Sequence, residues 1–433
     1  MLARVRRGPF RHKWFAWFTG AVGLGSIGDE VARLAMPLLA LELTHSLAAA
    51  ATLRIVQLVP YVLFGAFAGA LIDRAEKRTL LIVSDALRAV VIATVPIAVI
   101  LGVFSLELLY AAAFVMGSLE VVWALTTDFS VVPALVDRDE LTEANAAYLG
   151  ADRVARIAGP ALGGLAIAAA GTANALWLCT LAYLPTILVF LRMPPIYESD
   201  VPTTTLTVAN VRKEIADGFR GIFDSAVLRS LLVLMFVTNL GNSGLQTLLI
   251  FVLSEEHKVD AAVIGIALSL SGMVQILGSA FAPRIARGRP LGHTMLWVVI
   301  AGSIGPILAS VLRDWRLITA AIAARQTAWA AHIVYVYLPR QREVPPELRG
   351  RINGSFRTMV VVANVSSPAL LTWIQGVSSS SMAFAAAGVL GFAAAAITYF
   401  SPLRAYDIRE APSELEALEP VAEREAEDET ADV

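Results

Sequence analysis

The stretch at residues 65–78, which reads GAFAGALIDRAEKR, contains the two features that decide the fold. Gly65 and Gly69 lie one helical turn apart in an apolar run, and small residues at this spacing let two membrane helices approach closely. The run ends in a short charged turn made of Asp73, Arg74, Lys77 and Arg78. This pattern predicts a helix that leaves the membrane into a basic loop. The same residues could also form an ordinary basic loop next to a closely packed helix pair, without any special function.

The composition of the whole chain agrees with a membrane protein. The 433 residues are 57% hydrophobic and 16% charged, and the mean hydropathy is +0.67. A soluble protein is about 25% charged, so this chain lacks the polar surface that a water-soluble globule needs. Soluble enzymes, nucleic-acid binders and disordered proteins are therefore excluded. Because one span takes about 20 residues, the length allows about a dozen spans.

Twelve apolar segments are long enough to cross the membrane. They are rich in Ala and Leu and too long for the strands of a barrel, so they predict an all-α membrane protein. The segments are 14–41, 48–72, 79–101, 107–129, 148–170, 173–193, 228–253, 260–283, 291–312, 316–339, 352–376 and 381–401. The first follows a basic stretch, as a signal peptide does, but it is too long for one and is interrupted by charges.

The basic residues predict the orientation. If the N-terminus is cytosolic, the inner segments carry 22 Lys and Arg and the outer loops carry three. The positive-inside rule then places both termini in the cytosol. We expect a multi-pass protein of the cytoplasmic membrane, with the lipid bilayer around it. Residues 1–13 form a basic cytosolic N-terminus. Residues 403–433 form an acidic tail without an apolar face, which is predicted to be disordered.

A polar linker at 194–227 divides the chain into two six-helix halves, 14–193 and 228–402. Ala144-Asn145 and the later Gly159-Pro160-Ala161-Leu162 are echoed by Ile352-Asn353 and Ser367-Pro368-Ala369-Leu370 at a constant offset of 208 residues. The echo places the fifth span over the eleventh. A 6+6 duplication is therefore predicted.

The loop motif resembles the signature of the major facilitator superfamily, G-x-x-x-D-R-x-x-R-R. It matches at Gly69, Asp73, Arg74, Lys77 and Arg78, with Lys in place of the first Arg of the last pair. Further similar strings lie at 27–29, 35–38, 131–136, 141–145 and 344–351. Together they resemble the exporter branch that contains macrolide efflux proteins and the enterobactin exporter. The resemblance implies alternating access and assigns the five motif residues to a cytosolic gate.

The fifth span contains a second motif, formed by Arg156, Gly159, Pro160, Gly163 and Gly164. It resembles the end of a motif associated with drug/H⁺ antiporters, although Ala146 and Ala155 stand where that motif has glycine. A kinked, closely packed helix is the alternative interpretation, because Pro160 bends a helix and glycines allow close contact.

Ionisable side chains deep in membrane spans are costly and indicate a pathway. Asp29, Glu30 and Arg33 lie in the first span, Glu120 in the fourth, and Arg325 with Gln326 in the tenth. Asp29 and Arg33 share a helix face and could instead form a structural ion pair. Glu120 has no basic neighbour in its own helix, which predicts protonation near neutral pH. We expect Asp29 and Glu120 to couple protons, and the other four residues to line the substrate cavity.

The seventh span carries a polar stripe of Asn239, Asn242 and Gln246. It faces a cavity or joins helices, and its amides suit a neutral or zwitterionic amphipathic solute. The five histidines, at 12, 45, 257, 293 and 332, show no metal-ligand spacing. No phosphate-binding loop occurs, which excludes ATP as the energy source in this chain. Neither a cofactor nor a metal is predicted.

The predicted function is secondary active transport, in which protons drive the export of a drug-like, siderophore-like or other amphipathic small molecule. One alternative is a facilitator that moves a lysophospholipid or a metabolite. A transporter-like sensor or binding protein is a second. A membrane-embedded enzyme would need paired His and Asp or a Ser/Lys dyad at matching depth, and the sequence contains neither.

Overall fold

The computed structural model describes residues 8–74, 76–127, 131–196, 208–287, 289–344 and 348–407. At 65–74, 125, 138, 208–215, 277, 283 and 349–350 it describes the backbone alone. Every regular element within these ranges is a helix. The predicted acidic tail beyond 407 and the first seven residues lie outside the described ranges.

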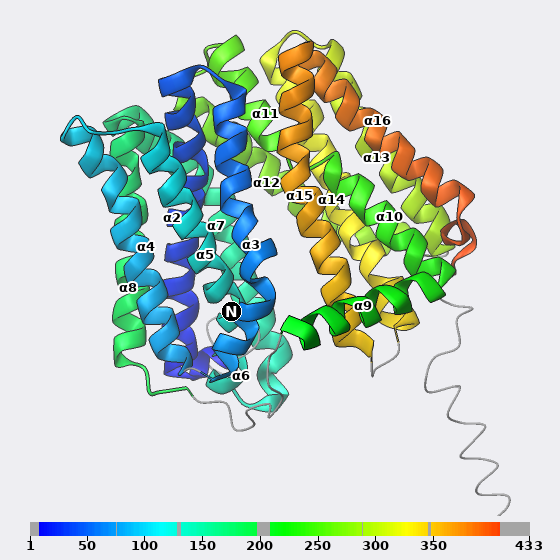
Figure 1. Cartoon of the computed structure of the whole chain (residues 1–433), viewed down its shortest axis with the longest axis horizontal. Helices are drawn as coiled ribbons and strands as arrows, with labels where there is room; N and C mark the ends of the chain where they lie inside the picture. Colours follow the sequence, from blue (N-terminus) through cyan, green and yellow to red (C-terminus); the bar gives the residue numbers. More distant parts are fainter. Residues whose placement is uncertain are drawn as a thin grey trace, which may run out of the picture.

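Two groups of long helices stand side by side (Figure 1). The first half contains α2 (Lys13–Thr44), α3 (Leu47–Arg74), α4 (Lys77–Ile100), α5 (Leu106–Thr126), α7 (Leu141–Ala170) and α8 (Thr172–Arg192). The second half contains α10 (Ala226–Leu240), α11 (Leu245–Phe251), η4 (Val252–Glu256), α12 (Ala261–Ala286), α13 (Leu291–Val311), α14 (Trp315–Glu343), α15 (Arg349–Val377) and α16 (Ser380–Phe400). Short helices, which lie outside the long spans, are η1 (Pro9–Arg11), α6 (Val132–Leu135), η3 (Arg138–Glu140) and η6 (Pro402–Ala405).

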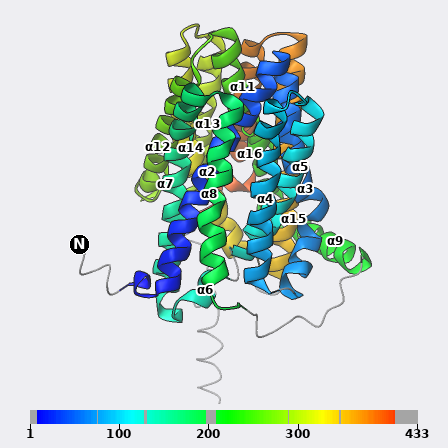
Figure 2. The same cartoon turned by 90° about the vertical axis from the view of Figure 1, so that its left-hand side faces the viewer.

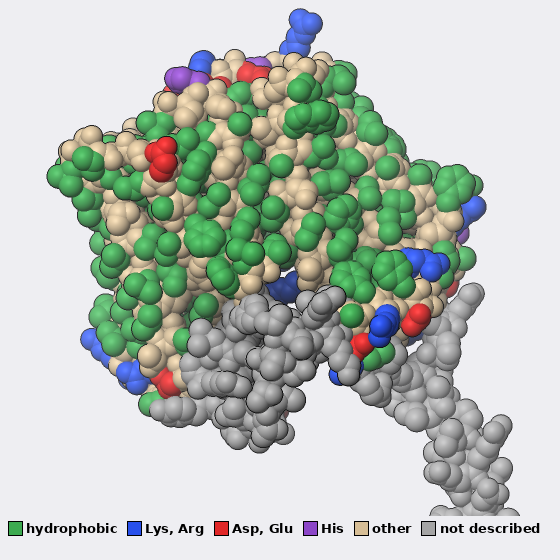
Figure 3. Space-filling view, in the orientation of Figure 1, with side chains coloured by type: hydrophobic (Ala, Val, Ile, Leu, Met, Phe, Trp, Pro, Cys, Tyr) green, Lys and Arg blue, Asp and Glu red, His purple; other side chains and the backbone are tan. Residues whose placement is uncertain are grey.

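The described helices confirm an all-α membrane protein. Ten of them are long and apolar enough to cross a membrane, and hydrophobic side chains cover the flanks of the molecule (Figure 3). The helices α2 and α14, with 32 and 29 residues, are also long enough but do not meet the same composition limit. They contain most of the predicted intramembrane site residues. The count of twelve spans therefore stays a prediction for these two helices.

Helix ends are set by capping residues at the membrane surface. Asp314 caps α14 by accepting from the backbone N–H of Arg316 at 2.7 Å, and Ser379 caps α16 by accepting from Met382 at 3.2 Å. Such caps satisfy backbone donors that have no partner within the helix. Gly171 separates α7 from α8 with φ of 86°, a left-handed conformation that glycine adopts without strain.

The buried apolar side chains form different cores at the two ends of the molecule. We call the end at which α2 begins the inner end, following the predicted orientation. Near the outer end a single core joins both halves, with members such as Leu41 of α2 and Phe251 of α11. Near the inner end each half has its own core, around Phe18 in the first half and Phe356 in the second. Among the side chains that the structure describes, the apolar core that joins the two halves therefore lies near the outer end.

The predicted continuous helix at 228–253 is interrupted. Residues 241–244 form turns between α10 and α11, and the N–H of Gly244 donates to the hydroxyl of Ser367 at 2.8 Å. A Cβ at Gly244 would lie 3.0 Å from the Cα of Pro368, so the break allows α15 to approach closely. The predicted linker contains one further helix, α9 (Val208–Asp224), which projects beside the inner end of the bundle (Figure 2).

Candidate functional site

Three charged residues of α2 each contact a different part of the first half. Asp29, Glu30 and Arg33 lie about halfway along this 32-residue helix, so they sit near the middle of the membrane. Successive residues of a helix point about 100° apart, and Asp29 and Glu30 therefore face different neighbours. Two charged clusters result, which are described below.

The Asp29 cluster joins α2 to α4 and α8. The carboxylate of Asp29 accepts from Arg88 at 2.6 Å and from the hydroxyl of Tyr183. The same guanidinium lies 3.4 Å from Asp85 and stacks 4.6 Å from the ring centre of Tyr183. Asp85 is 1% exposed, and its second carboxylate oxygen has no partner among the described residues. One buried carboxylate, Asp85, and one partly exposed carboxylate, Asp29, therefore share one arginine.

The alternative in which Asp29 and Arg33 form an ion pair is wrong. Arg33 instead pairs with Glu30, three residues before it, while Asp29 turns toward Arg88. The physical reason is that Arg88, which is buried, has to be neutralised and can reach Asp29 from α4. Helix spacing alone cannot show a partner on another helix.

The Glu30 cluster joins α2 to α7. Glu30 pairs with Arg33 and lies 3.4 Å from Arg156, which also binds Asp152 at 2.8 Å. A side chain at Gly159 would collide with the Cβ of Glu30. The glycine of the predicted motif therefore lets α7 approach the charged face of α2.

Glu120 is not isolated, contrary to the sequence-based expectation. Its carboxylate lies 3.7 Å from the guanidinium of Arg33, which comes from α2 rather than from the helix that carries Glu120. The Glu120 side chain is 40% exposed and lines a small cavity of about 30 Å³. Asp29, Arg54 and Arg88 line the same cavity. The acid is thus open to water and close to both charged clusters.

Five of these residues were not predicted from the sequence: Arg54, Asp85, Arg88, Asp152 and Tyr183. Asp85 and Arg88 lie within the predicted span 79–101, so the signal was visible as two charges three residues apart in an apolar run. Tyr183 gave no such signal, because tyrosine is common in apolar helices. Its hydrogen bond to Asp29 depends on the packing of α8 against α2.

A larger cavity of about 160 Å³ lies between the two halves, and we call it the central cavity. It brings together six of the seven residues predicted to line the substrate cavity, namely Glu30, Arg33, Asn242, Gln246, Arg325 and Gln326. Arg156 and Pro160 of the motif in the fifth span also line it, together with Gln275 and apolar side chains. Arg325 donates to the side-chain oxygen of Asn242. Asn239 is not among the lining residues, because its amide donates to the carbonyl of Met235 at 2.7 Å and the chain turns directly after it.

The second sequence motif, Arg156 to Gly164, lies in α7, where this helix contacts α12 of the other half. A side chain at Gly164 would collide with the carbonyl of Ala261, and one at Gly265 with the carbonyl of Pro160. The N–H of Ala161 donates to the hydroxyl of Ser269 of α12 at 2.9 Å. Gly163 faces α2, where its Cβ would lie 3.2 Å from the Cα of Val31. The small residues therefore permit close contact between α7 and α12, as the packing interpretation requires.

The predicted cytosolic gate is described in part. The side chains of Gly69, Asp73 and Arg74 lie outside the described residues. Lys77 is buried at 1% exposure, and Arg78 donates to the carbonyl of Leu191 at 2.9 Å. Both residues begin α4, so the described part of the motif fastens the loop to its own half.

Glu76, within the same loop, caps α4. It accepts from the backbone N–H groups of Arg78 and Thr79 at 2.9 and 2.8 Å and from that of Ile196 at 3.0 Å. Burial raises the pKa of Glu76, but the hydrogen bonds from Thr79, Ile196 and Arg78 outweigh that effect, and the pKa is lowered overall. The charged carboxylate therefore holds the start of α4 to the segment after α8.

One histidine has acidic neighbours that the sequence spacing did not indicate. His12 lies 2.7 Å from Glu140 and 3.7 Å from Asp137, which are far from it along the chain. Arg11 already pairs with the same two carboxylates, at 3.3 and 2.7 Å. The group therefore fastens the start of α2 to η3 without a metal ion being required.

The chain is similar to known membrane transporters. A family model described as a transmembrane secretion effector matches residues 6–432. The multidrug efflux pump Tap of Mycolicibacterium fortuitum is 25% identical over 369 residues, which cover 84% of this chain and 88% of Tap. The enterobactin exporter EntS of Shigella flexneri is 23% identical over 368 residues, which cover 84% of both chains.

A solved structure has the same fold. It is a bacterial homologue of the human lysosomal transporter Spinster in an inward-facing and unoccupied conformation. It superimposes with a TM-score of 0.70 at 14% sequence identity, covering 94% of this chain and 99% of that chain.

Proposed function

We propose that this chain, which belongs to the transmembrane secretion effector family of the major facilitator superfamily, exports an amphipathic small molecule in exchange for protons. The family membership confirms the resemblance found in the sequence. The family and its relatives are membrane transporters and not enzymes. What this chain exports and what drives the export are parts of the proposal.

The observation that carries the proposal is the unequal packing of the two halves. One apolar core crosses both halves at the outer end, whereas each half has a separate core at the inner end. A transporter of this type moves substrate by rocking its halves around a site near the midplane. The packing supports an inward-facing state in which the central cavity receives substrate from the cytosol.

The charge balance of the first half supports proton coupling. Nine charged side chains line its cavities or join by ion pairs there: the acids Asp29, Glu30, Asp85, Glu120 and Asp152, and the bases Arg33, Arg54, Arg88 and Arg156. Five acids against four bases leave one negative charge, and one proton neutralises the set. A neutral set costs less to enclose in a low-dielectric interior than a charged one. Asp29 and Glu120 stay the proposed proton carriers, and Asp85 joins them because it shares Arg88 with Asp29.

The remaining assignments follow from the same proposal. The cytosolic gate consists of five residues of the loop motif, namely Gly69, Asp73, Arg74, Lys77 and Arg78. The motif in α7 forms the hinge surface against α12. Both termini lie in the cytosol and the chain resides in the cell membrane, as the distribution of basic residues predicts. The two halves, 14–193 and 228–402, move as the rocking units.

The test uses inverted membrane vesicles, in which export carries substrate into the lumen. The probe is the uncharged fluorophore N-phenyl-1-naphthylamine. We expect accumulation when the lumen is acidic and none after the pH gradient is collapsed with nigericin. Entry of the probe that stops at equal concentrations inside and outside, and that is the same with and without a pH gradient, would favour the facilitator alternative. Binding without any entry would favour a sensor.

A matched pair of variants in α5 assigns the coupling. Glu120→Gln removes the carboxylate beside Arg33, whereas Glu107→Gln removes an exposed carboxylate in the first turn of the same helix. We expect both variants to insert normally and only Glu120→Gln to lose accumulation driven by the pH gradient. Full accumulation by Glu120→Gln would remove this acid from the proton pathway.

A further inference from the structure

The second half differs from the first in the sign of its intramembrane charge. All nine members of the charged set named above belong to the first half. Between residues 226 and 402 the acids are Glu255, Glu256, Asp260, Asp314, Glu343 and Glu347. The first five lie at or beyond helix ends, and Glu347 lies outside the described residues. Inside the helices of this half the sequence therefore supplies no carboxylate that could neutralise a buried cation.

Arg325 is such a buried cation. It is the eleventh residue of α14, which places it about 15 Å from the outer end of the helix and near the midplane. The residue is 8% exposed and lines the central cavity. It also borders a smaller cavity of about 30 Å³ behind α14.

The described contacts of Arg325 leave its charge uncompensated. The guanidinium donates to the neutral amide oxygen of Asn242 and stacks 5.5 Å from the ring centre of Trp329. Arg33, Arg88 and Arg156 in the first half each pair with a carboxylate, but no described Asp or Glu pairs with Arg325. An arginine stays charged at neutral pH, and a buried charge without a partner is unfavourable. This position is therefore poised to gain a negatively charged partner.

We propose that Arg325 binds the anionic group of the transported molecule, so that the substrate is an amphipathic organic anion. This inference rests on the proposed export function and names the substrate class. The planar guanidinium has five N–H donors, and Asn242 takes one of them, which leaves donors for a carboxylate or sulfonate. The cation and the anion then form a neutral pair in the cavity.

The other walls of the central cavity fit the rest of such a molecule. Leu249, Leu268 and Ile322 provide apolar surface, and the amides of Gln246 and Gln275 provide hydrogen-bonding groups. The carboxylate of Glu30 lies on the opposite wall, where Arg33 and Arg156 neutralise it. An anion is therefore directed to the wall formed by the second half. There it is separated from the carboxylates of the first half that exchange protons.

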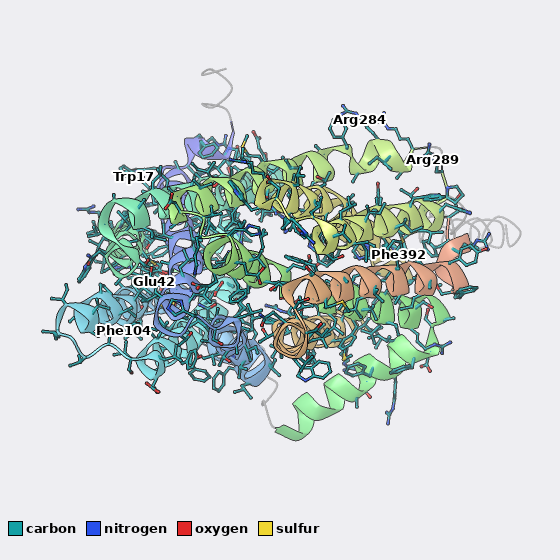
Figure 4. The ribbon with its side chains drawn as sticks, turned by 90° about the horizontal axis from the view of Figure 1, so that it is seen from above. Trp17, Glu42, Phe104, Arg284, Arg289 and Phe392 are labelled. Carbon is teal, nitrogen blue, oxygen red and sulfur yellow. The ribbon has the colours of Figure 1, made fainter. Side chains whose placement is uncertain are left out.

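The test compares two probes with the same aromatic skeleton. One is 8-anilinonaphthalene-1-sulfonate, an anion, and the other is N-phenyl-1-naphthylamine, which lacks the sulfonate. Accumulation is measured in inverted vesicles, and binding is measured with purified protein in nanodiscs. The variants are Arg325→Gln, which removes the charge, and Arg325→Lys, which keeps it. Arg284→Gln is the control, because Arg284 lies at the edge of the second half, away from the boundary between the halves (Figure 4).

We expect Arg325→Gln to weaken binding of the sulfonate probe by about 10- to 100-fold, which is the usual effect of losing a charge-assisted hydrogen bond. Binding of the uncharged probe should change by less than about two-fold, and Arg325→Lys should restore part of the sulfonate binding. Equal losses for both probes in Arg325→Gln, or no loss for either, would overturn the inference.

Two results separate this inference from the proposed function. Export of the uncharged probe by a wild-type protein that neither binds nor exports the sulfonate would refute the anion site and leave export standing. Sulfonate binding that depends on Arg325, in vesicles that accumulate neither probe, would support the anion site and refute export.

Discussion

Asp29 and Asp85 share Arg88, and this arrangement predicts a strongly non-additive response to mutation. Asp29→Asn leaves Arg88 with Asp85, which lies 3.4 Å away, so we expect a loss of about 1–1.5 kcal/mol, as for one hydrogen bond. Arg88→Gln leaves two carboxylates without a cation in a site where the arginine side chain is only 4% exposed. Breaking a buried pair in this way costs about 3–5 kcal/mol.

The double variant Asp29→Asn/Asp85→Asn leaves Arg88 buried without a carboxylate and should also lose about 3–5 kcal/mol. Asp85→Asn alone should lose about 1–1.5 kcal/mol for the same reason as Asp29→Asn. The loss in the double variant should therefore exceed the sum of the two single losses, which is about 2–3 kcal/mol, as expected for residues in one network. Adding Arg88→Gln to the double variant should restore part of the stability. The assay is reversible unfolding in mixed micelles of dodecyl maltoside and sodium dodecyl sulfate. Equal losses in Asp29→Asn and Arg88→Gln, or additive losses in the double variant, would show that the two carboxylates do not share Arg88.

Three further predictions concern packing, capping and the outer contact. Gly265→Ala should lose about 1–3 kcal/mol and slow transport, because its Cβ collides with the carbonyl of Pro160, whereas Gly376→Ala, which has open space, should be neutral in the same unfolding assay. Glu76→Gln should lower the melting temperature at pH 7. Since the folded pKa of Glu76 lies below its ordinary value of 4.5, the stabilisation is complete above that pH and is lost as the pH falls through the folded pKa, so the two melting curves should converge in acid. His45→Asn removes the 3.0 Å contact with Glu255, which joins the two halves at the outer end. Because exposed pairs contribute up to about 1 kcal/mol, the labelling rate of a cysteine introduced into the outer wall of the cavity should rise by less than about five-fold. An unchanged rate would show that the contact does not hold the outer end closed.

The helical fold could be predicted from the sequence because it depends on local composition. An apolar run of about 20 residues has to form a helix in the membrane, whichever neighbours it packs against. The break at 241–244 was missed, since it depends on the approach of Pro368 from a distant helix rather than on the apolar pattern. The helix α9 was missed because the polar linker carries no apolar run of membrane-spanning length.

The site residues were found where a charge interrupts an apolar run, but their partners were not. The sequence around Glu120 shows no base in its own helix, whereas the guanidinium beside it comes from α2. Asp29 and Arg33 have the spacing of an ion pair, yet each has a competing partner, Arg88 or Glu30. Spacing in one helix shows which side chains share a face, and only the packing of helices shows which charges meet.

In the function that we propose, an opposing flow of protons drives export through the cavity between the halves. The most direct test measures both flows in one preparation of proteoliposomes, with pyranine reporting luminal pH and N-phenyl-1-naphthylamine as the transported probe. With an acidic lumen, inverted protein should accumulate the probe while the lumen becomes alkaline, and Glu120→Gln should abolish both signals. Probe accumulation with no change in proton flux, or proton flux that is the same with and without the probe, would contradict the account.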